Sequence, residues 1–300
     1  MSDRPVLAGA LGALVIAWSA ILVKLAEVSP STAAFFRCFY ALPLLGLLAW
    51  RERERYGERS RRDHLLGWLA GLLFAANLIF WHHAIEAVGA GLSTVLGNVQ
   101  VVFVALIAWA ALGERPENRS LIAVPIVFSG VVLISGVIGS SAYGDDPQLG
   151  VLFGLLNAIM YALFLLILRN LGADVRRPAG PLFDATASAA LFAAIGGLAV
   201  GDIDFVPGVE SQVWLIVLAL SSQVLGWLLI STSLPRLPAL LTSIVLMLQP
   251  VGTMILGILI FSESPSALQL TGVVVVLAGV GFATTAPAQL TSRRRPVSTS

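Results

Sequence analysis

Long apolar stretches alternate along this chain with short segments that hold nearly all of its charged residues. A helix that crosses a lipid bilayer needs about 20 mostly apolar residues, and ten stretches come close to that length. These expected spans are 5–26, 32–50, 65–87, 92–112, 120–138, 149–169, 180–200, 211–232, 239–260 and 266–286. The pattern therefore predicts an all-α membrane protein with ten transmembrane helices.

Composition supports this prediction and narrows the function. Hydrophobic residues make up 57% of the chain and charged residues 12%, whereas a soluble domain is about one quarter charged. A net charge of +1 gives no basis for nucleic-acid binding. The single cysteine, Cys38, excludes an internal disulfide framework and stands apart from any metal-binding motif. We expect no cofactor and no metal.

The distribution of lysine and arginine predicts the orientation. If the N-terminus is cytoplasmic, the segments on that side hold 16 of the 18 basic residues, six of them in the stretch RERERYGERSRR. The opposite loops are acidic, as in YGDDPQ and GDIDFVPGVE. Basic residues favour the cytoplasmic side. We therefore expect a cell inner (plasma) membrane protein with both termini in the cytoplasm and a cytoplasmic tail over 287–300.

Two stretches, TVLGNVQVVFVALIAWAALGERP and IVLMLQPVGTMILGILIFSESP, carry polar residues at the same spacing. Each pair is 149 residues apart (249−100, 263−114, 265−116): Gln100 with Gln249, Glu114 with Glu263, and Pro116 with Pro265. Further upstream, VLAGALGALVIAWSAILVK aligns with VLFGLLNAIMYALFLLILR. Residues 5–138 and 149–286 are therefore interpreted as two repeats of five spans each.

An odd number of spans makes the second repeat start on the opposite side of the membrane from the first. The two halves must then be inverted about an axis in the membrane plane, as in many secondary transporters. Such symmetry gives alternating access a simple basis, because each half can adopt the conformation of the other. The alternative is an ancestral duplication without functional consequence.

Several of these segments resemble a known family. LGERPENRSLIAVPIVFSGVVLI and LQPVGTMILGILIFSESPSALQLTGVVVVLAGV resemble the endings of the two EamA repeats, and SPSTAAFFRCFYALPLL resembles their Pro-then-Arg second helix. The resemblance covers nearly the whole chain and is to the drug/metabolite transporter superfamily, most of all its bacterial aromatic amino acid exporters. It implies a ten-helix bundle whose central cavity exports small metabolites. Val101 replaces the motif's proline in the first repeat, so a hinge role falls to Pro250 alone.

Polar side chains inside membrane spans are costly and are therefore candidates for function. Three spans place an amide four residues before an aromatic ring, on the same helix face. These pairs are Asn77 with Trp81, Asn157 with Tyr161, and Gln223 with Trp227. Aromatic rings could stack on a substrate while amides bind an ammonium or a carboxylate group. The alternative is that the amides join helices by hydrogen bonds.

Other polar residues extend the predicted binding site. Gln100 and Gln249 are expected to face one another across the symmetry axis, with Asn98 nearby and a bend at Pro250. His82 and His83 are candidates for substrate binding or for carrying a proton. The alternative for these two histidines is a surface network with Glu86 and with Lys24 or Arg37. Glu114 and Glu263 are interpreted as caps of the helices that follow them.

These observations favour a secondary transporter that exports small amphipathic metabolites, with aromatic or large apolar amino acids as the preferred substrates. Multidrug, nucleobase or other metabolite export is the alternative within the superfamily, and a passive channel or an integral-membrane enzyme is the alternative outside it. No HExxH, DDxxD or GxSxG motif supports an enzyme. Because no carboxylate lies near a span centre, facilitated diffusion stands beside proton exchange. The expected partners are the substrate and the bilayer, with protons as a candidate coupling ion, and we expect one chain to suffice.

Overall fold

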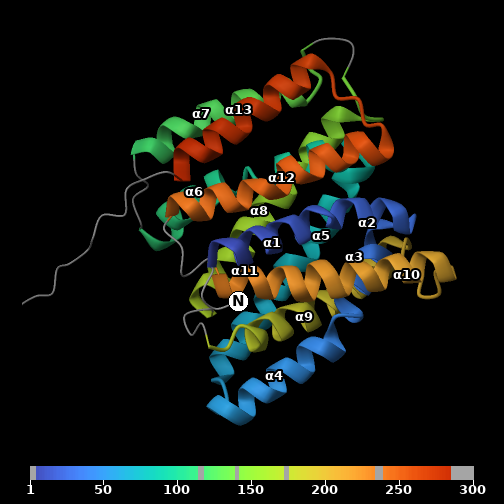
Figure 1. Cartoon of the computed structure of the whole chain (residues 1–300), viewed down its shortest axis with the longest axis vertical. Coiled ribbons are helices and arrows are strands. Elements are labelled where there is room, and N and C mark those ends of the chain that lie inside the picture. The colour runs from blue at the N-terminus through green and yellow to red at the C-terminus, as the bar shows by residue number, and fades with distance from the viewer. Residues whose placement is uncertain (1–4, 114–117, 139–141, 172–175, 234–238, 285–300) are drawn as a thin grey trace, which may run out of the picture.

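A computed structural model describes residues 5–113, 118–138, 142–171, 176–233 and 239–284. Within these residues the chain is helical and contains no strand, which confirms the predicted all-α class. Figure 1 shows the helices lying side by side in one bundle, with α7 and α13 at one end of its longest axis and α4 at the other.

The described residues of the first half form seven helices: α1 (Pro5–Ala17), α2 (Ser19–Ala26), α3 (Pro30–Phe39), α4 (Leu42–Tyr56), α5 (Arg61–Gly97), α6 (Gln100–Leu112) and α7 (Asn118–Ile134). The second half contains α8 (Pro147–Leu171), α9 (Ala179–Val200), α10 (Val209–Leu218), the π-helical stretch η1 (Ala219–Gly226), α11 (Trp227–Ser233), α12 (Ala239–Phe261) and α13 (Ala267–Thr284).

Each of the ten predicted spans overlaps a helix among the described residues, but the helices differ in length. Six described segments are long and apolar enough to cross a membrane: Pro5–Ala26, Pro30–Tyr56, Arg61–Gly97, Pro147–Leu168, Ala179–Val200 and Val209–Ser233. Four further apolar helices are shorter: Gln100–Ala111, Leu121–Ile134, Val245–Phe261 and Ala267–Ala283. The protein therefore has at least six segments suited to spanning a bilayer, and the number ten stays a prediction.

Several predicted spans are interrupted. The first is divided at Trp18 between α1 and α2, and Asn98 and Val99 separate α5 from α6. Within α5, Gly89 has φ 83° and ψ 171°, a backbone conformation that favours glycine. The element α5 is therefore two helices joined at Gly89. Irregular backbone at membrane depth is tolerated where protein buries it or where it lines a cavity. At these interruptions the chain changes from one helix to the next, so the bundle is not built from continuous straight helices.

Local sequence explains where the first-half helices begin. Ser29 accepts a hydrogen bond from the backbone N–H of Thr32, and Pro30 occupies the first turn of α3. Ser60 and Asp63 form a reciprocal capping box at the start of α5. Both starts satisfy N–H groups that have no partner within the helix.

The two halves of the chain pack against each other throughout the bundle. The second-half helices α8 and α9 lie against α5, α1 lies against α12, α2 against α10, and α7 against α13. Small residues allow close approach: a Cβ at Gly130 of α7 would lie 2.8 Å from the carbonyl oxygen of Gly272 on α13. Neither half forms a separate core, so any cavity at the centre is lined by both.

Candidate substrate cavity

A small cavity of about 80 Å³ lies inside the bundle, between helices of both halves. Seven of the predicted binding residues line it: Asn77, Trp81, Asn98, Asn157, Tyr161, Trp227 and Gln249. They come from α5, α8, α11, α12 and the break between α5 and α6. Typical ligand pockets hold roughly 300–1,000 Å³, so this cavity is smaller than a typical ligand pocket.

Aromatic rings form one wall of this cavity. The indole of Trp227 stands almost perpendicular to Phe74, Tyr161 and Phe164, with centroid separations of 5.9, 6.2 and 5.7 Å. Edge-to-face contacts of this kind are favourable. The indole Nε1–H of Trp227 is buried and has no hydrogen-bond acceptor among the described residues. The wall is therefore an aromatic surface with one unpartnered hydrogen-bond donor.

Two of the predicted amides bond to each other. The side-chain nitrogen of Asn77 donates to the side-chain oxygen of Asn157 and, at 3.3 Å, to its backbone oxygen. This pair ties α5 to α8, as expected if amides join helices. Both residues also line the cavity, so the helix-joining interpretation is confirmed for this pair, and substrate contact stays a prediction.

Gln223 occupies a different place from its repeat counterpart, Asn77. It lies in η1, is fully buried and is not among the cavity-lining residues. Its Oε1 accepts a hydrogen bond from Nε of Arg37 at 3.0 Å, and its Nε2 donates to Oγ1 of Thr186 at 3.1 Å. Both the oxygen and the nitrogen of this amide are hydrogen-bonded to other side chains, so Gln223 holds the Arg37 guanidinium in place and has no direct contact with the cavity.

Arg37 is a site residue that sequence reasoning missed. The alternative that placed it in a surface network is wrong, because its side chain comes from α3, is only 3% exposed and lines the cavity. Its guanidinium lies 5.8 Å from the ring centre of Trp81, and Nη1 donates to Oγ of Ser19 at 3.4 Å. One signal could have revealed it: a lone basic residue inside an apolar span is a functional candidate by default.

The two glutamines related by the repeat have different surroundings. Gln249 lines the cavity, whereas Gln100 does not. Oε1 of Gln100 is buried and receives no hydrogen bond from the part of the chain that the structure describes. Pro250 lies inside α12, which continues as one helix from Ala239 to Phe261. A hinge at Pro250 stays a prediction.

The two histidines lie away from the central cavity. His82 is buried, and its Nδ1 lies 3.0 Å from the carbonyl oxygen of Pro30. Since a carbonyl only accepts, Nδ1 carries the proton and the unpartnered Nε2 is an acceptor. His83 contacts Glu86 at 3.2 Å and stacks on Phe153 with ring centres 4.9 Å apart. The contact between His83 and Glu86 agrees with the network interpretation.

Glu263 caps a helix of the other half of the chain. Its carboxylate accepts hydrogen bonds from the backbone N–H groups of Ala90 and Gly91, at 2.7 and 3.1 Å, and from Nζ of Lys24 at 2.9 Å. The capped element is the part of α5 that follows Gly89, not the helix after Glu263. The expectation that Glu263 caps the helix that follows it is therefore wrong: the residue is a helix cap, but for a helix of the other half of the chain. Glu114, the counterpart of Glu263, lies outside the described residues.

An open pocket of about 890 Å³ adjoins this cap, at the end of the bundle predicted to face outwards. Its lining includes Lys24, His82, Glu86 and Tyr143. Partial burial, followed by the nearby carboxylates of Glu263 and Asp145, raises the pKa of the Tyr143 phenol. The phenol is therefore neutral over the physiological range of pH.

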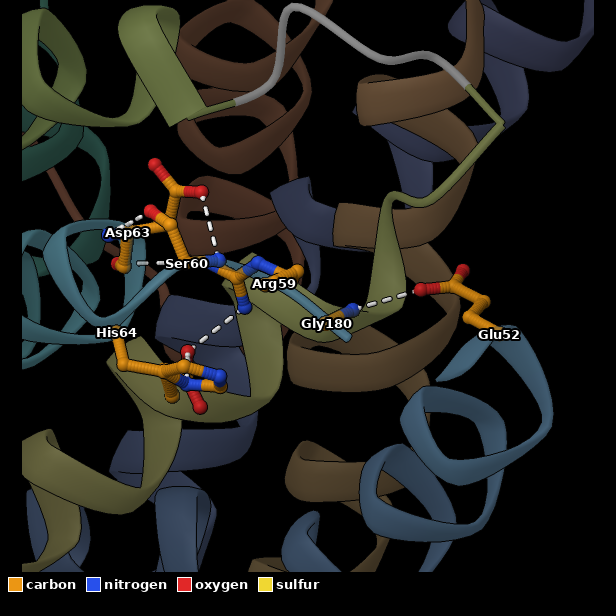
Figure 2. A network of polar contacts seen from close by, with 7 residues as sticks. Glu52, Arg59, Ser60, Asp63, His64 and Gly180 are labelled. Atoms are coloured by element: carbon orange, nitrogen blue, oxygen red, sulfur yellow. Dashed lines mark hydrogen bonds and ion pairs between the residues drawn. The ribbon is translucent and has the colours of Figure 1, made fainter. Parts of the chain in front are cut away.

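A second polar network lies at the opposite end, where the sequence predicts the cytoplasm (Figure 2). Oδ2 of Asp184 accepts hydrogen bonds from Nη1 of Arg59 at 2.7 Å and from Nδ1 of His64 at 2.8 Å. Glu52 accepts from the first backbone N–H groups of α9, including that of Gly180 at 2.8 Å. The network joins α4, α5 and α9, and its buried carboxylate is already paired.

Apolar helices long enough to cross a bilayer, packed around an interior cavity, define a multi-pass membrane protein. The chain belongs to the EamA-like transporter family, which it matches twice, over residues 4–136 and 148–285. The family predicted from the sequence is thereby confirmed, and the chain is grouped with transporters, not with enzymes. The narrower likeness to aromatic amino acid exporters stays a prediction.

Individual proteins show the same likeness. An uncharacterized transporter of Bacillus subtilis (strain 168), YxxF, is 24% identical over 259 residues, which are 83% of this chain and 79% of that protein. A protein of known crystal structure is 15% identical and has a TM-score of 0.63, with 94% of this chain and 98% of the other covered. At that identity the second likeness shows the fold alone.

Proposed function

We propose that this protein exports small amphipathic metabolites across the cell inner membrane through its central cavity, by alternating access between its two inverted halves. One observation carries the proposal: each of the three predicted amide–aromatic pairs contributes at least one residue to a single cavity lined by both halves. Such a position between repeats is where secondary transporters bind their substrates. Both termini are placed in the cytoplasm, as the basic residues predict.

The lining favours a substrate with an apolar body and polar ends. Phe74, Tyr161 and Trp227 offer ring faces and edges, and the amides of Asn98 and Gln249 can exchange hydrogen bonds with polar groups. Aromatic or large apolar amino acids fit this description best. Nucleobases and amphipathic drugs are the alternatives that the same test examines.

The proposal is tested by counterflow in proteoliposomes across a panel of amino acids, nucleobases and drugs. We expect Trp81→Ala combined with Trp227→Ala to abolish transport of the best solute, because both rings line the cavity. The matched control combines Trp68→Ala with Trp109→Ala, since those two side chains are 41% and 47% exposed on the outside of the bundle. Size-exclusion profiles and thermal unfolding in detergent establish that each variant is folded.

Two results would contradict the proposal. The first is the absence of counterflow for every solute of the panel in the unmodified protein. The second is unchanged transport by the cavity double variant while it remains folded, because the cavity would then lie off the transport path.

A further inference from the structure

We propose that Arg37 binds a carboxylate group of the transported solute, so that the protein selects carboxylate-bearing solutes over amines and neutral analogues. This inference rests on the proposed transport function and names the chemical class of its substrate. It begins from the charges buried inside the bundle.

Three charged side chains are buried among the described residues: Arg37, Asp184 and Glu263. Asp184 is paired with Arg59, and Glu263 is paired with Lys24. Arg37 forms no ion pair with any carboxylate of the described chain. Each buried carboxylate thus has its own cation, while the buried guanidinium lacks an anion.

A guanidinium keeps its charge inside a protein, so Arg37 cannot become neutral to relieve its burial. Its observed partners are the uncharged oxygens of Gln223 and Ser19 and the ring of Trp81. These contacts hold the planar group in place without balancing its charge. An anion that enters the cavity would supply the missing partner.

The Arg37 guanidinium also has N–H donors without a hydrogen-bond acceptor among the described residues. Nε is engaged by Gln223 and one Nη1 proton by Ser19, whereas Nη2 has no acceptor among the residues that the structure describes. Arg37 lines the cavity, and so does Trp227, whose buried indole N–H is likewise unpartnered. Guanidinium donors match the two oxygens of a carboxylate in a planar, two-point contact.

The rest of the lining suits the other parts of an amino acid. Asn98 donates its side-chain N–H to the backbone oxygen of Thr94 at 2.9 Å, which leaves its amide oxygen as an acceptor. Gln249 adds a second amide to the same cavity. Amide oxygens accept hydrogen bonds from an ammonium group, and the aromatic wall receives the apolar side chain.

The second half of the chain has no equivalent cation. The helix α9 occupies the position of α3 in the second repeat and carries no lysine or arginine between Ala179 and Val200. Its one charged residue, Asp184, is the carboxylate paired with Arg59. The cavity therefore has a single basic pole and is suited to a single carboxylate.

The test compares solutes that share a phenyl ring and differ in whether they carry a carboxylate, an ammonium group or both. Proteoliposomes carrying the unmodified protein are assayed with phenylalanine, phenylalaninamide, phenethylamine and 3-phenylpropionate. Because hydrogen bonds to charged groups are the strong ones, we expect phenylalanine to be transported roughly tenfold or more faster than its amide and than phenethylamine. Arg37→Gln is expected to abolish that preference, and Arg37→Lys to retain part of it.

Binding gives a second readout that does not depend on transport. Because a ligand stabilises the state that binds it, 3-phenylpropionate should raise the unfolding temperature of the purified protein while phenethylamine does not. Arg37→Gln should lose this response. Arg62→Gln is the matched control: it removes one positive charge at an exposed position of α5 outside the cavity lining, so the preference for carboxylates should persist.

The outcomes separate this inference from the proposed function. Equal transport of phenylalanine and its amide by the unmodified protein would overturn the carboxylate assignment and leave the transport function standing. A preference that persists in folded Arg37→Gln protein would also overturn it. No transport of any solute would overturn both. If Arg37→Gln does not fold, the preference of the unmodified protein decides alone.

Discussion

Buried charged residues differ in how their charge is balanced, and this difference separates structural from functional side chains. Asp184 and Arg59 form an ion pair whose side chains are 8% and 13% exposed. Arg37 is equally buried but has only neutral partners. Removing one member of a balanced buried pair leaves the other charge uncompensated, whereas Arg37 has no carboxylate partner among the described residues to lose. Asp184 should therefore matter for stability and Arg37 for selectivity.

We predict that Asp184→Asn lowers the free energy of unfolding by about 3 kcal/mol, because it leaves the Arg59 guanidinium buried without an anion. Thermal unfolding in detergent measures the loss. The control is Glu86→Gln, whose side chain is 57% exposed beside His83, and where a change below about 1 kcal/mol is expected. Equal unfolding temperatures for Asp184→Asn and the unmodified protein would show that the pair contributes nothing.

At the scale of elements, the break within α5 depends on a residue from the other half of the chain. Gly89 has a positive φ, and a Cβ there would lie 2.7 Å from Oε1 of Glu263. The carboxylate satisfies the first N–H groups of the helix that restarts at Ala90, where a negative charge is favourable. Gly89 permits the break in the helix, and the Glu263 carboxylate, paired with Lys24, stabilises the helix start that follows it.

We predict that Glu263→Gln destabilises the protein by about 2 kcal/mol, because the amide loses the charge that favours the helix start and leaves Lys24 without its anion. Amide hydrogen exchange should accelerate at Ala90 and Gly91, whose N–H groups the carboxylate binds. The control is Glu27→Gln at the exposed end of α2. Unaltered exchange at both amides would contradict the capping role.

At the scale of the whole molecule, the interleaved halves place every buried carboxylate of the described residues at a bundle end. Asp184 is paired with Arg59 and His64 at the predicted cytoplasmic end, and Glu263 lies beside the outer pocket. Both are paired with cations. His82 donates to the carbonyl of Pro30 and does not line the central cavity. The cavity lining thus offers no carboxylate or imidazole to carry a proton alongside the solute.

We therefore predict transport down the gradient of the solute itself. In proteoliposomes, a protonophore should leave the initial transport rate within about twofold of its untreated value, since no carboxylate or imidazole of the described residues lines the cavity to couple proton movement. An imposed pH gradient should not concentrate the solute. Uphill accumulation driven by that gradient would contradict the prediction and establish proton exchange.

Much of the site followed from the sequence, because an amide or a tryptophan inside an apolar span stands out against its neighbours. Asn77, Trp81, Asn157 and Tyr161 were identified by helical spacing alone, and all four line the cavity. Gln223 has the same spacing beside Trp227 yet points to Arg37. Spacing assigns residues to a common helix face, but it does not say which neighbouring helix that face meets.

The sequence by itself determined that the chain is helical, that its halves are repeats and that polar groups gather near the centre. Apolar segments in a bilayer must satisfy their backbone hydrogen bonds internally, and this requirement acts locally. Only the tertiary structure decided that Asn77 bonds to Asn157, that Glu263 caps a helix of the other half, and that Arg37 is buried without a carboxylate. Each of these depends on which helices are neighbours, because a charge or an amide is balanced by whatever lies beside it in space.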